Sequence, residues 1–191
     1  MAVYLKEISD TQLGLIMDRK KAECKSKYVY NRLTLRAVES SGINPDAVET
    51  FYSKEPLPQE YFTQSGTVLM KLFSPFNPVV ITRETEGYLF PSQMVSIRLK
   101  ERVLPEYICL YLSQDSVSKR FLENYSGIAQ RAITVDSLLN LKVKVPSLEK
   151  QQLICEYSQN YKLLCRLRRD LEKNEQVMMK HIFSELSKEK D

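Results

Sequence analysis

The chain has 191 residues, 43% of them hydrophobic and 27% charged, which is an ordinary composition for a soluble globular protein. This length accommodates one domain with an extension, or two small domains. Apolar runs such as residues 79–81 (Val-Val-Ile) are far shorter than the roughly 20 residues of a membrane-spanning helix. The first ten residues contain Lys6, Glu7 and Asp10 and no apolar leader, so we expect a cytoplasmic protein with no membrane partner.

The first half of the chain alternates short apolar stretches with turn residues. Residues 28–38 are rich in aromatic and β-branched side chains, which favours a strand. Residues 66–73 indicate a buried strand entered through a tight turn, and the prolines and asparagine at 75–78 end it. We also expect a short strand or opening turn at 3–8, an apolar patch at 13–17, loops at 40–46 and 56–58, and the start of another strand at 79–83.

The second half is expected to add helices. Residues 94–99 alternate apolar and polar side chains, as does a strand with one polar face. The Leu-Pro-Glu sequence at 104–106 opens a helix. A second helix is expected at 116–125, a loop at 126–133, a helix or turn at 135–141 and a strand at 142–146. The predicted fold class is α+β: one mixed α/β domain at 1–145, a helix at 146–188 and a tail at 189–191.

The longest regular pattern follows Pro146. A proline with Glu149 close behind it suits a helix start, because the first N–H groups are unpaired and the helix dipole favours negative charge there. Apolar side chains then recur at three- and four-residue steps over roughly nine turns. They are Ile154, Tyr157, Tyr161, Leu164, Leu167, Leu171, Met178, Ile182 and Leu186. A small domain does not need so long a helix to cover its own core, so we expect this one to pair with another helix.

Polar residues on the same helix have two interpretations. Asn174 falls within the apolar stripe, where a single polar residue commonly fixes the register of paired helices. The alternative is that it lies at the solvent-facing edge of the stripe. His181 is the only histidine, and we expect it to be solvated or at the edge of the seam.

The cysteines give no metal site and no disulfide framework. Cys24, Cys109, Cys155 and Cys165 are scattered and form no Cys-x-x-Cys pair. We expect reduced, mostly packed thiols, no metal and no cofactor.

The net charge of +4 is only mildly basic, but its distribution is uneven. Residues 19–36 hold seven basic side chains against one acid, interleaved with Tyr28, Tyr30 and Asn31. Lysine and arginine neutralise phosphates, whereas tyrosine and asparagine can contact bases and backbone. The alternative is a solvated basic surface with two tyrosines packed on a strand.

Four segments, in order, carry a resemblance to a known family. They are Gly66-x-Val68-Leu69, then Leu104-Pro105-Glu106-Tyr107 at a helix start, then Ser126-Gly127-x-x-Gln130-Arg131, then Val145-Pro146-x-Leu148-Glu149-x-Gln151-x-x-Ile154 before the long helix. They resemble the specificity subunit of type I restriction–modification enzymes, over one target-recognition domain and the conserved helix after it. The last segment is the most specific of the four.

Two departures from the family pattern matter. The family has Asp where this chain has Thr67, so a capping carboxylate is replaced by a hydroxyl or lost. The usual subunit resembles two such halves in tandem, and this chain resembles one. We therefore expect a half-subunit whose helix forms a coiled coil with a copy of itself or with a related half. Symmetric pairing predicts a palindromic, interrupted DNA target.

The resemblance implies a non-catalytic subunit that recognises double-stranded DNA and gives sequence specificity to methyltransferase subunits. A restriction (motor-nuclease) subunit is the further partner that the family implies. The alternative is an adaptor or decoy that docks on a methyltransferase subunit through its helix without reading DNA.

The expected DNA contacts are basic, aromatic and amide side chains. We expect Lys25, Lys27 and Arg32 to contact phosphates, Tyr28, Asn31, Gln93 and Arg131 to contact base edges, and Gln130 to contact backbone or a base. For each of them the alternative is an ordinary surface residue. The partner-binding residues are those of the apolar stripe from Ile154 to Ile182.

Sequence features of DNA-modifying enzymes are missing. A methyltransferase that acts on bases needs a glycine-rich cofactor loop and an Asn/Asp-Pro-Pro-aromatic turn. Asn77-Pro78 is followed by Val79, and the five glycines form no Gly-x-Gly-x-x-Gly. Glu84-x-Glu86 is too common a pair to indicate a nuclease. We therefore expect no enzymatic activity.

Overall fold

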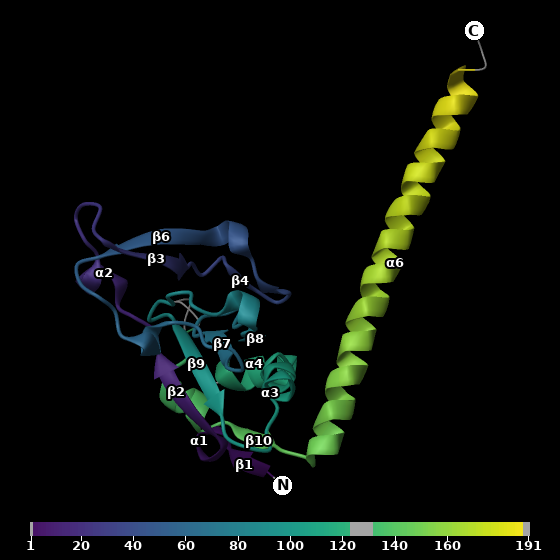
Figure 1. Ribbon diagram of the computed structural model, residues 1–191. Helices are drawn as coiled ribbons and strands as arrows, with labels where there is room; N and C mark the ends of the chain where they lie inside the picture. The colour runs from purple at the N-terminus through teal and green to yellow at the C-terminus, as the bar shows by residue number, and fades with distance from the viewer. Residues whose placement is uncertain (1, 123–131, 189–191) are drawn as a thin grey trace. The chain divides into compact units, whose positions relative to one another are not determined.

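The chain divides into two units, Met1–Gln151 and Gln152–Asp191, and the computed structural model describes residues 2–122 and 132–188 (Figure 1). The first unit is a mixed α/β domain, and the second consists of most of one long helix. The predicted α+β class with a long C-terminal helix is therefore confirmed. No helix within the described ranges is both long enough and apolar enough to cross a membrane.

The first unit is centred on a four-stranded antiparallel sheet in the order β2-β9-β7-β8. These strands are β2 (Ser9–Leu13), β9 (Met94–Leu99), β7 (Val68–Lys71) and β8 (Val79–Val80). Within β9, Ile97 pairs with Thr11 on one side and with Val68 on the other. All four residues of β7 are buried, so this strand is covered on both faces.

Helices cover the sheet. Helix α3 (Pro105–Leu112) packs against β7 and β8 and buries Tyr107, Ile108 and Leu112. It begins with a proline at its first position, where the missing N–H would have no helical partner. Helix α4 (Asp115–Leu122) follows, and its Phe121 ring meets the Phe76 ring edge-on at 5.4 Å between centroids.

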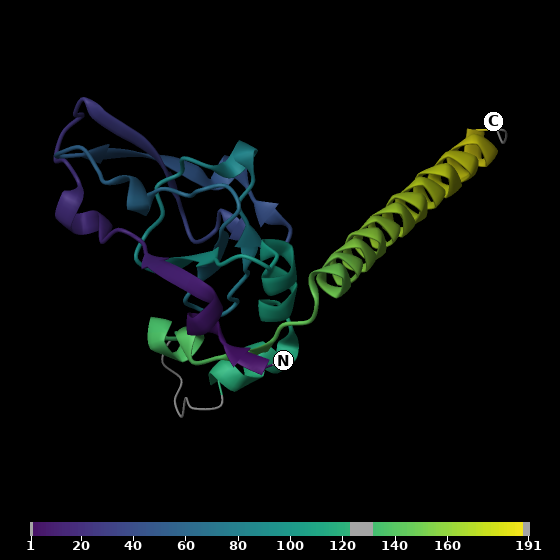
Figure 2. The same cartoon turned by 60° about the horizontal axis from the view of Figure 1, so that its bottom comes forward.

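A two-stranded antiparallel ribbon of β3 (Tyr28–Leu33) and β6 (Val48–Ser53) lies to one side of this sheet in both views (Figures 1 and 2). The strands β4 (Val38–Glu39) and β5 (Gly42–Ile43) and the turn η1 (Pro45–Ala47) connect them. Leu33 from the ribbon and Leu69, Phe90 and Met94 from the sheet region share one buried cluster. Hydrophobic burial therefore joins the ribbon to the sheet.

Each edge of the ribbon is paired along part of its length. On the β3 edge, the Leu89 amide donates to the Asn31 carbonyl and the Leu33 amide donates to the Leu89 carbonyl, each at 2.8 Å. On the β6 edge, Lys21 bridges to Ser53. These contacts shorten both exposed edges of the ribbon.

The ends of the first unit are joined by a second small sheet. Strand β1 (Ala2–Tyr4) pairs antiparallel with β10 (Lys142–Lys144), and helix α1 (Leu5–Ile8) contacts α5 (Val135–Leu139). The remaining elements are α2 (Met17–Lys20), η2 (Gln59–Tyr61) and η3 (Arg83–Thr85).

Helix α6 (Leu148–Lys188) begins in the first unit and forms the second. In its first turn the side chain of Gln151 is fully buried and makes three hydrogen bonds to the first unit. From Leu153 onward most of its large apolar side chains are exposed. They are Leu153, Ile154, Tyr157, Tyr161, Leu163, Leu164, Leu167, Leu171, Val177, Met178, Met179, Ile182 and Phe183. The side chain of Leu186 lies outside the described part of the helix.

Several predicted elements need correction. The strand expected at 28–38 ends at Leu33, because the Ala37 amide donates back to the Thr34 carbonyl in a turn (3.1 Å). The strand expected at 66–73 is confined to β7, and strands β2 and β6 were not predicted. All four cysteines are free, as expected; Cys155 is buried and Cys109 and Cys165 are half-buried, whereas Cys24 is exposed and departs from the expectation of packed thiols.

The turn before β7 shows what Thr67 does in place of an aspartate. Gly66 has φ +80°, a conformation that glycine adopts at little cost. The Thr67 hydroxyl donates to the Gln64 carbonyl at 2.7 Å, which closes the turn. A carboxylate cannot donate this bond, so the hydroxyl takes a different role from a capping carboxylate.

Candidate nucleic-acid interface

The basic segment of residues 19–36 runs from α2 through an irregular connection into β3 and the turn after it. Lys21, Lys25 and Lys27 are exposed. Lys54, whose amide donates to the Lys20 carbonyl (2.9 Å), adds a fourth exposed amino group at the end of β6. None of these four, which we call the lysine cluster, forms an ion pair with any residue in 2–122 or 132–188. Their charge is available to an anionic ligand.

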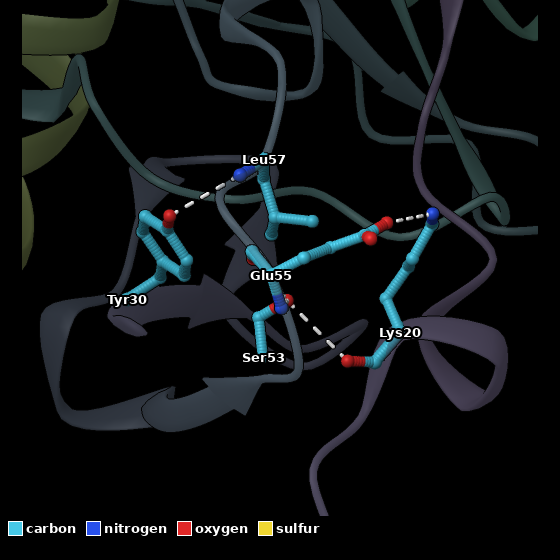
Figure 3. Close-up of polar contacts among 5 residues, drawn as sticks. All are labelled: Lys20, Tyr30, Ser53, Glu55 and Leu57. Carbon is cyan, nitrogen blue, oxygen red and sulfur yellow. Dashed lines mark hydrogen bonds and ion pairs between the residues drawn. The ribbon is translucent and has the colours of Figure 1, made fainter. Parts of the chain in front are cut away.

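Polar contacts join the segments that carry the lysine cluster (Figure 3). Lys20 forms an ion pair with Glu55, and the Ser53 hydroxyl donates to the Lys20 carbonyl (3.3 Å). The Tyr30 hydroxyl accepts from the Leu57 amide (3.2 Å), as Figure 3 shows. These contacts fasten the segment after β6 to α2 and to β3.

The expected base-reading residues of β3 have different surroundings. The half-buried Tyr28 ring lies under the Lys27 ammonium, 5.0 Å from nitrogen to ring centroid, a cation–π contact that orients the lysine. Asn31 is exposed, and its side chain forms no hydrogen bond with the described residues. Arg32 pairs with Glu49 across the ribbon at 2.5 Å. Glu49 partly neutralises Arg32, so we expect Arg32 to contribute less to phosphate binding than the lysine cluster does.

Gln93 and Arg32 are brought together at a shallow cavity of about 340 Å³. Its walls come from three segments: 16–18, 32–36 and 91–93. Gln93 is exposed, and its backbone carbonyl accepts from the Leu72 amide (2.8 Å), so its position is fixed by the sheet. The cavity is therefore a second place where an amide and two arginines, Arg32 and Arg36, face solvent together.

Lys71 is the one lysine near this surface that is buried, at 8% exposed. Burial lowers the pKa of its ammonium below the usual value, and the nearby Glu39 carboxylate opposes that shift. Its Nζ donates to the Leu35 carbonyl at 3.5 Å, within the turn that follows β3. Lys71 thus supports that turn and is not exposed to a ligand.

Two of the expected contacts, Gln130 and Arg131, lie outside the described residues. Three residues that the sequence did not suggest, Val29 on β3 and Thr50 and Tyr52 on β6, lie on the same face of the ribbon as Asn31. Only the register between β3 and β6 places these residues beside Asn31, and that register could not be predicted because β6 itself was not predicted.

Comparison with known proteins identifies the family. Residues 2–177 match the family described as the type I restriction modification DNA specificity domain. The chain belongs to this family. The match covers both the domain that carries the lysine cluster and most of α6.

Two solved structures show the same fold at low identity. The HsdS subunit from Thermoanaerobacter tengcongensis is 17% identical with a TM-score of 0.67, over 94% of this chain and 47% of that one. A chain from a structure described as the basis of complex assembly and conformational transition of the type I R-M system is 18% identical with a TM-score of 0.62, over 88% of this chain and 40% of that one. The chain therefore spans less than half the length of either structure. No curated protein sequence matches it.

The family is one of DNA recognition, and its specificity subunits are in general non-catalytic members of restriction–modification complexes. Within residues 2–122 and 132–188, no group of three or more His, Cys, Asp or Glu side chains is placed to hold a metal ion. His181 is exposed, and its Nδ1 lies 4.0 Å from Glu185 Oε1 on the same helix, a position that fits either a solvated histidine or one at the edge of a helix seam.

Proposed function

We propose that this chain reads DNA sequence for a type I restriction–modification complex and has no catalytic activity of its own. One observation carries the proposal: in a member of a DNA specificity family, four lysines that form no ion pair with the described residues lie on the segments next to the exposed Asn31 and the half-buried Tyr28. Phosphates bind lysine without regard to sequence, and base edges are read by amides and aromatic side chains. The lysine cluster would supply affinity, and its neighbours would supply specificity.

We further propose that α6 pairs with another helix, from a second copy or a related half, to place two readers on a bipartite site. The exposed stripe from Ile154 to Ile182 supports this. Burying each such side chain contributes roughly 1.5–3 kcal/mol, and their sum must exceed the entropy lost on association. In this proposal residues 1–145 are the recognition domain and 146–188 the pairing helix.

The proposed partners are a methyltransferase subunit, which would methylate DNA at the sequence that this chain recognises, and a restriction subunit. Because the substrate would be chromosomal or incoming DNA, we propose that the protein acts in the cytoplasm. Neither partner's chemistry requires a cofactor to be held by this chain.

Sequencing of methylated bases in the source genome, with and without the gene, tests the proposed function. We expect one interrupted motif to lose its methylation when the gene is deleted and to regain it on complementation. If the methylated motifs are unchanged while the chain still co-purifies with a methyltransferase subunit, it is an adaptor or decoy and the proposal is wrong.

A further inference from the structure

The two faces of the β3–β6 ribbon have opposite surroundings. Residues directly paired in an antiparallel ribbon share a face, and the face alternates along each strand. Tyr30 pairs with Phe51, which is 3% exposed in a cluster with Phe62, and the Tyr30 ring contacts Phe62 at 5.2 Å. This face packs against the rest of the first unit.

The opposite face carries three cross-strand pairs, and the pair at one end, Leu33 with Val48, packs into the core. The other two pairs are Val29 with Tyr52 and Asn31 with Thr50. Asn31 and Thr50 are exposed, Val29 is 52% exposed and Tyr52 is half-buried. Their polar groups make no side-chain hydrogen bond with residues of the described ranges. Four side chains thus form a compact outward block, which we call the ribbon quartet.

Positive charge stands at one end of the ribbon quartet. Lys27 directly precedes β3, and Lys54 directly follows β6. Because Tyr28 pairs with Ser53, these two lysines lie at the same end of the ribbon. The ribbon quartet is uncharged, and the neighbouring lysines form no ion pair with the described residues. This arrangement is complementary to a DNA groove, where base edges lie between phosphates.

The dimensions and chemistry favour the major groove over other ligands. That groove, about 12 Å wide, admits a two-stranded ribbon, whereas the minor groove, at about 6 Å, admits one only when the DNA is deformed. Each edge of the ribbon is paired along part of its length, by Leu89 on β3 and by residues 20–22 on β6, which leaves little edge for addition of a peptide strand. Val29 is the only strongly exposed aliphatic side chain of the quartet, which is little apolar surface for a protein partner.

We infer that the ribbon quartet enters the DNA major groove and reads base edges there, with Asn31 on an adenine and Val29 against a thymine methyl group. Asparagine pairs with the N6 and N7 atoms of adenine, and apolar side chains contact the thymine methyl. Thr50 and Tyr52 would contact neighbouring edges or phosphates. The inference rests on the proposed function and adds which element reads, in which groove, and a preference for A·T pairs.

The test begins with selection of a random duplex library by the full chain. We expect the wild type to enrich one sequence that contains A·T pairs. Asn31→Ala should lose discrimination at one adenine position by about 5- to 150-fold, the range of one good bidentate contact. Gln114→Ala, which removes an exposed amide between α3 and α4, is the matched control and should leave the selected sequence unchanged.

Modified bases in the selected duplex then test the groove. Replacing the adenine by 7-deazaadenine removes the N7 acceptor, and replacing thymine by uracil removes the methyl group; both lie in the major groove. Each replacement should weaken binding by the wild type. Asn31→Ala should be insensitive to 7-deazaadenine, and Val29→Ala should be insensitive to uracil.

The outcomes separate the inference from the proposed function. If the wild type selects a sequence that Val29→Ala, Asn31→Ala and Thr50→Ala select unchanged, the ribbon is not the reader but DNA reading stands. The inference would also be overturned if both base replacements weakened binding by these variants as much as they weaken binding by the wild type. If the wild type enriches no sequence at all, both are wrong. Circular dichroism and melting of each variant establish that it is folded.

Discussion

Gln151 links two separate segments of the first unit. Its Oε1 accepts from the Leu104 amide at 2.9 Å, and its Nε2 donates to the carbonyls of Arg102 and Pro146, each at 3.0 Å. Arg102 has φ +72°, an uncommon conformation for a residue other than glycine. The amide therefore holds the turn before α3 against the first turn of α6, which explains why a glutamine is needed in the segment after Pro146.

Replacing this amide by an acid should be strongly destabilising. In Gln151→Glu a carboxylate would face two carbonyls, and we expect the free energy of unfolding to fall by about 3 kcal/mol or more at pH 7. Burial would raise the pKa of the new carboxyl, so the loss should shrink as the pH falls and the folded form binds a proton. Urea unfolding at pH 7 and pH 5 measures this.

The control is Gln152→Glu, since Gln152 is exposed on the next position of the helix. It should change the free energy of unfolding by no more than about 0.5 kcal/mol at either pH. An equal loss in both variants would show that added negative charge, and not the buried hydrogen bonds, is responsible.

Gly14 is required by a close approach of two backbones. A Cβ built on it would lie 2.1 Å from the Pro91 carbonyl oxygen, where no atom can fit. Gly14→Ala should lower the free energy of unfolding by about 1–3 kcal/mol or more, because the backbone must shift. Thermal melting checks this against Leu13→Ala, an exposed neighbour at 42%, for which we expect about 0.5 kcal/mol. Equal melting temperatures for the two variants would contradict the geometry.

The part of the candidate site that could be predicted from the sequence is the part whose residues are close together along the chain. Lys25, Lys27, Tyr28 and Asn31 come from one contiguous segment, so a basic and aromatic run was enough to find them. The pairing of Arg32 with Glu49 joins residues 17 apart and depends on the ribbon register. Side-chain partners set by tertiary pairing leave no trace in a local pattern.

At the scale of elements, α6 carries a strict seven-residue row within its exposed apolar surface. Tyr157, Leu164, Leu171 and Met178 are 75%, 45%, 60% and 58% exposed. A seven-residue repeat keeps one seam facing a partner helix in a left-handed coiled coil. Leu163 is 55% exposed but lies about 100° around the helix from Leu164, outside this row.

This row predicts how self-association responds to charge. Leu171→Glu should convert a dimer to a monomer in sedimentation equilibrium, because it places a charge in the seam. Leu163→Glu makes the same change on the same helix outside the row and should leave the dimer intact. Equal effects of the two variants would mean that the contact is not this seam. A wild type that is monomeric at high micromolar concentration, alone and with a methyltransferase subunit, would refute the pairing itself.

The elements that could be predicted are those with a strong period of their own. The strand at 94–99, the helix opened by Pro105 and the long helix after Pro146 all have clear apolar periodicity. Strand β2 (Ser-Asp-Thr-Gln-Leu) has a single apolar residue and owes its conformation to pairing with β9. Strand β6 has the irregular sequence Val-Glu-Thr-Phe-Tyr-Ser, so its two buried positions gave no alternation to recognise.

For the whole molecule, DNA binding should depend on salt through the lysine cluster. Each phosphate contact contributes a slope of about −0.9 in log K against log salt. Lys54→Ala should therefore weaken binding to every DNA sequence and make that slope shallower by about 1. Fluorescence anisotropy with duplex DNA at salt concentrations from roughly 50 to 200 mM measures the binding constant and its dependence on salt.

Lys162→Ala removes the same charge from an exposed position on α6 and is the matched control. We expect its slope to equal that of the wild type. If both lysine variants change the slope equally, binding follows net charge and the lysine cluster is not a defined contact surface.

The opposite surroundings of the two ribbon faces have a consequence for how such a protein can change. Tyr30 and Phe51 on the inner face pack against the rest of the first unit, so the neighbouring positions 29, 31, 50 and 52 contribute less to that packing. Residues 29, 31, 50 and 52 can then be substituted together while the packing of the inner face is retained. A library varied at these positions alone would remain folded and would sample new preferences without rebuilding the protein.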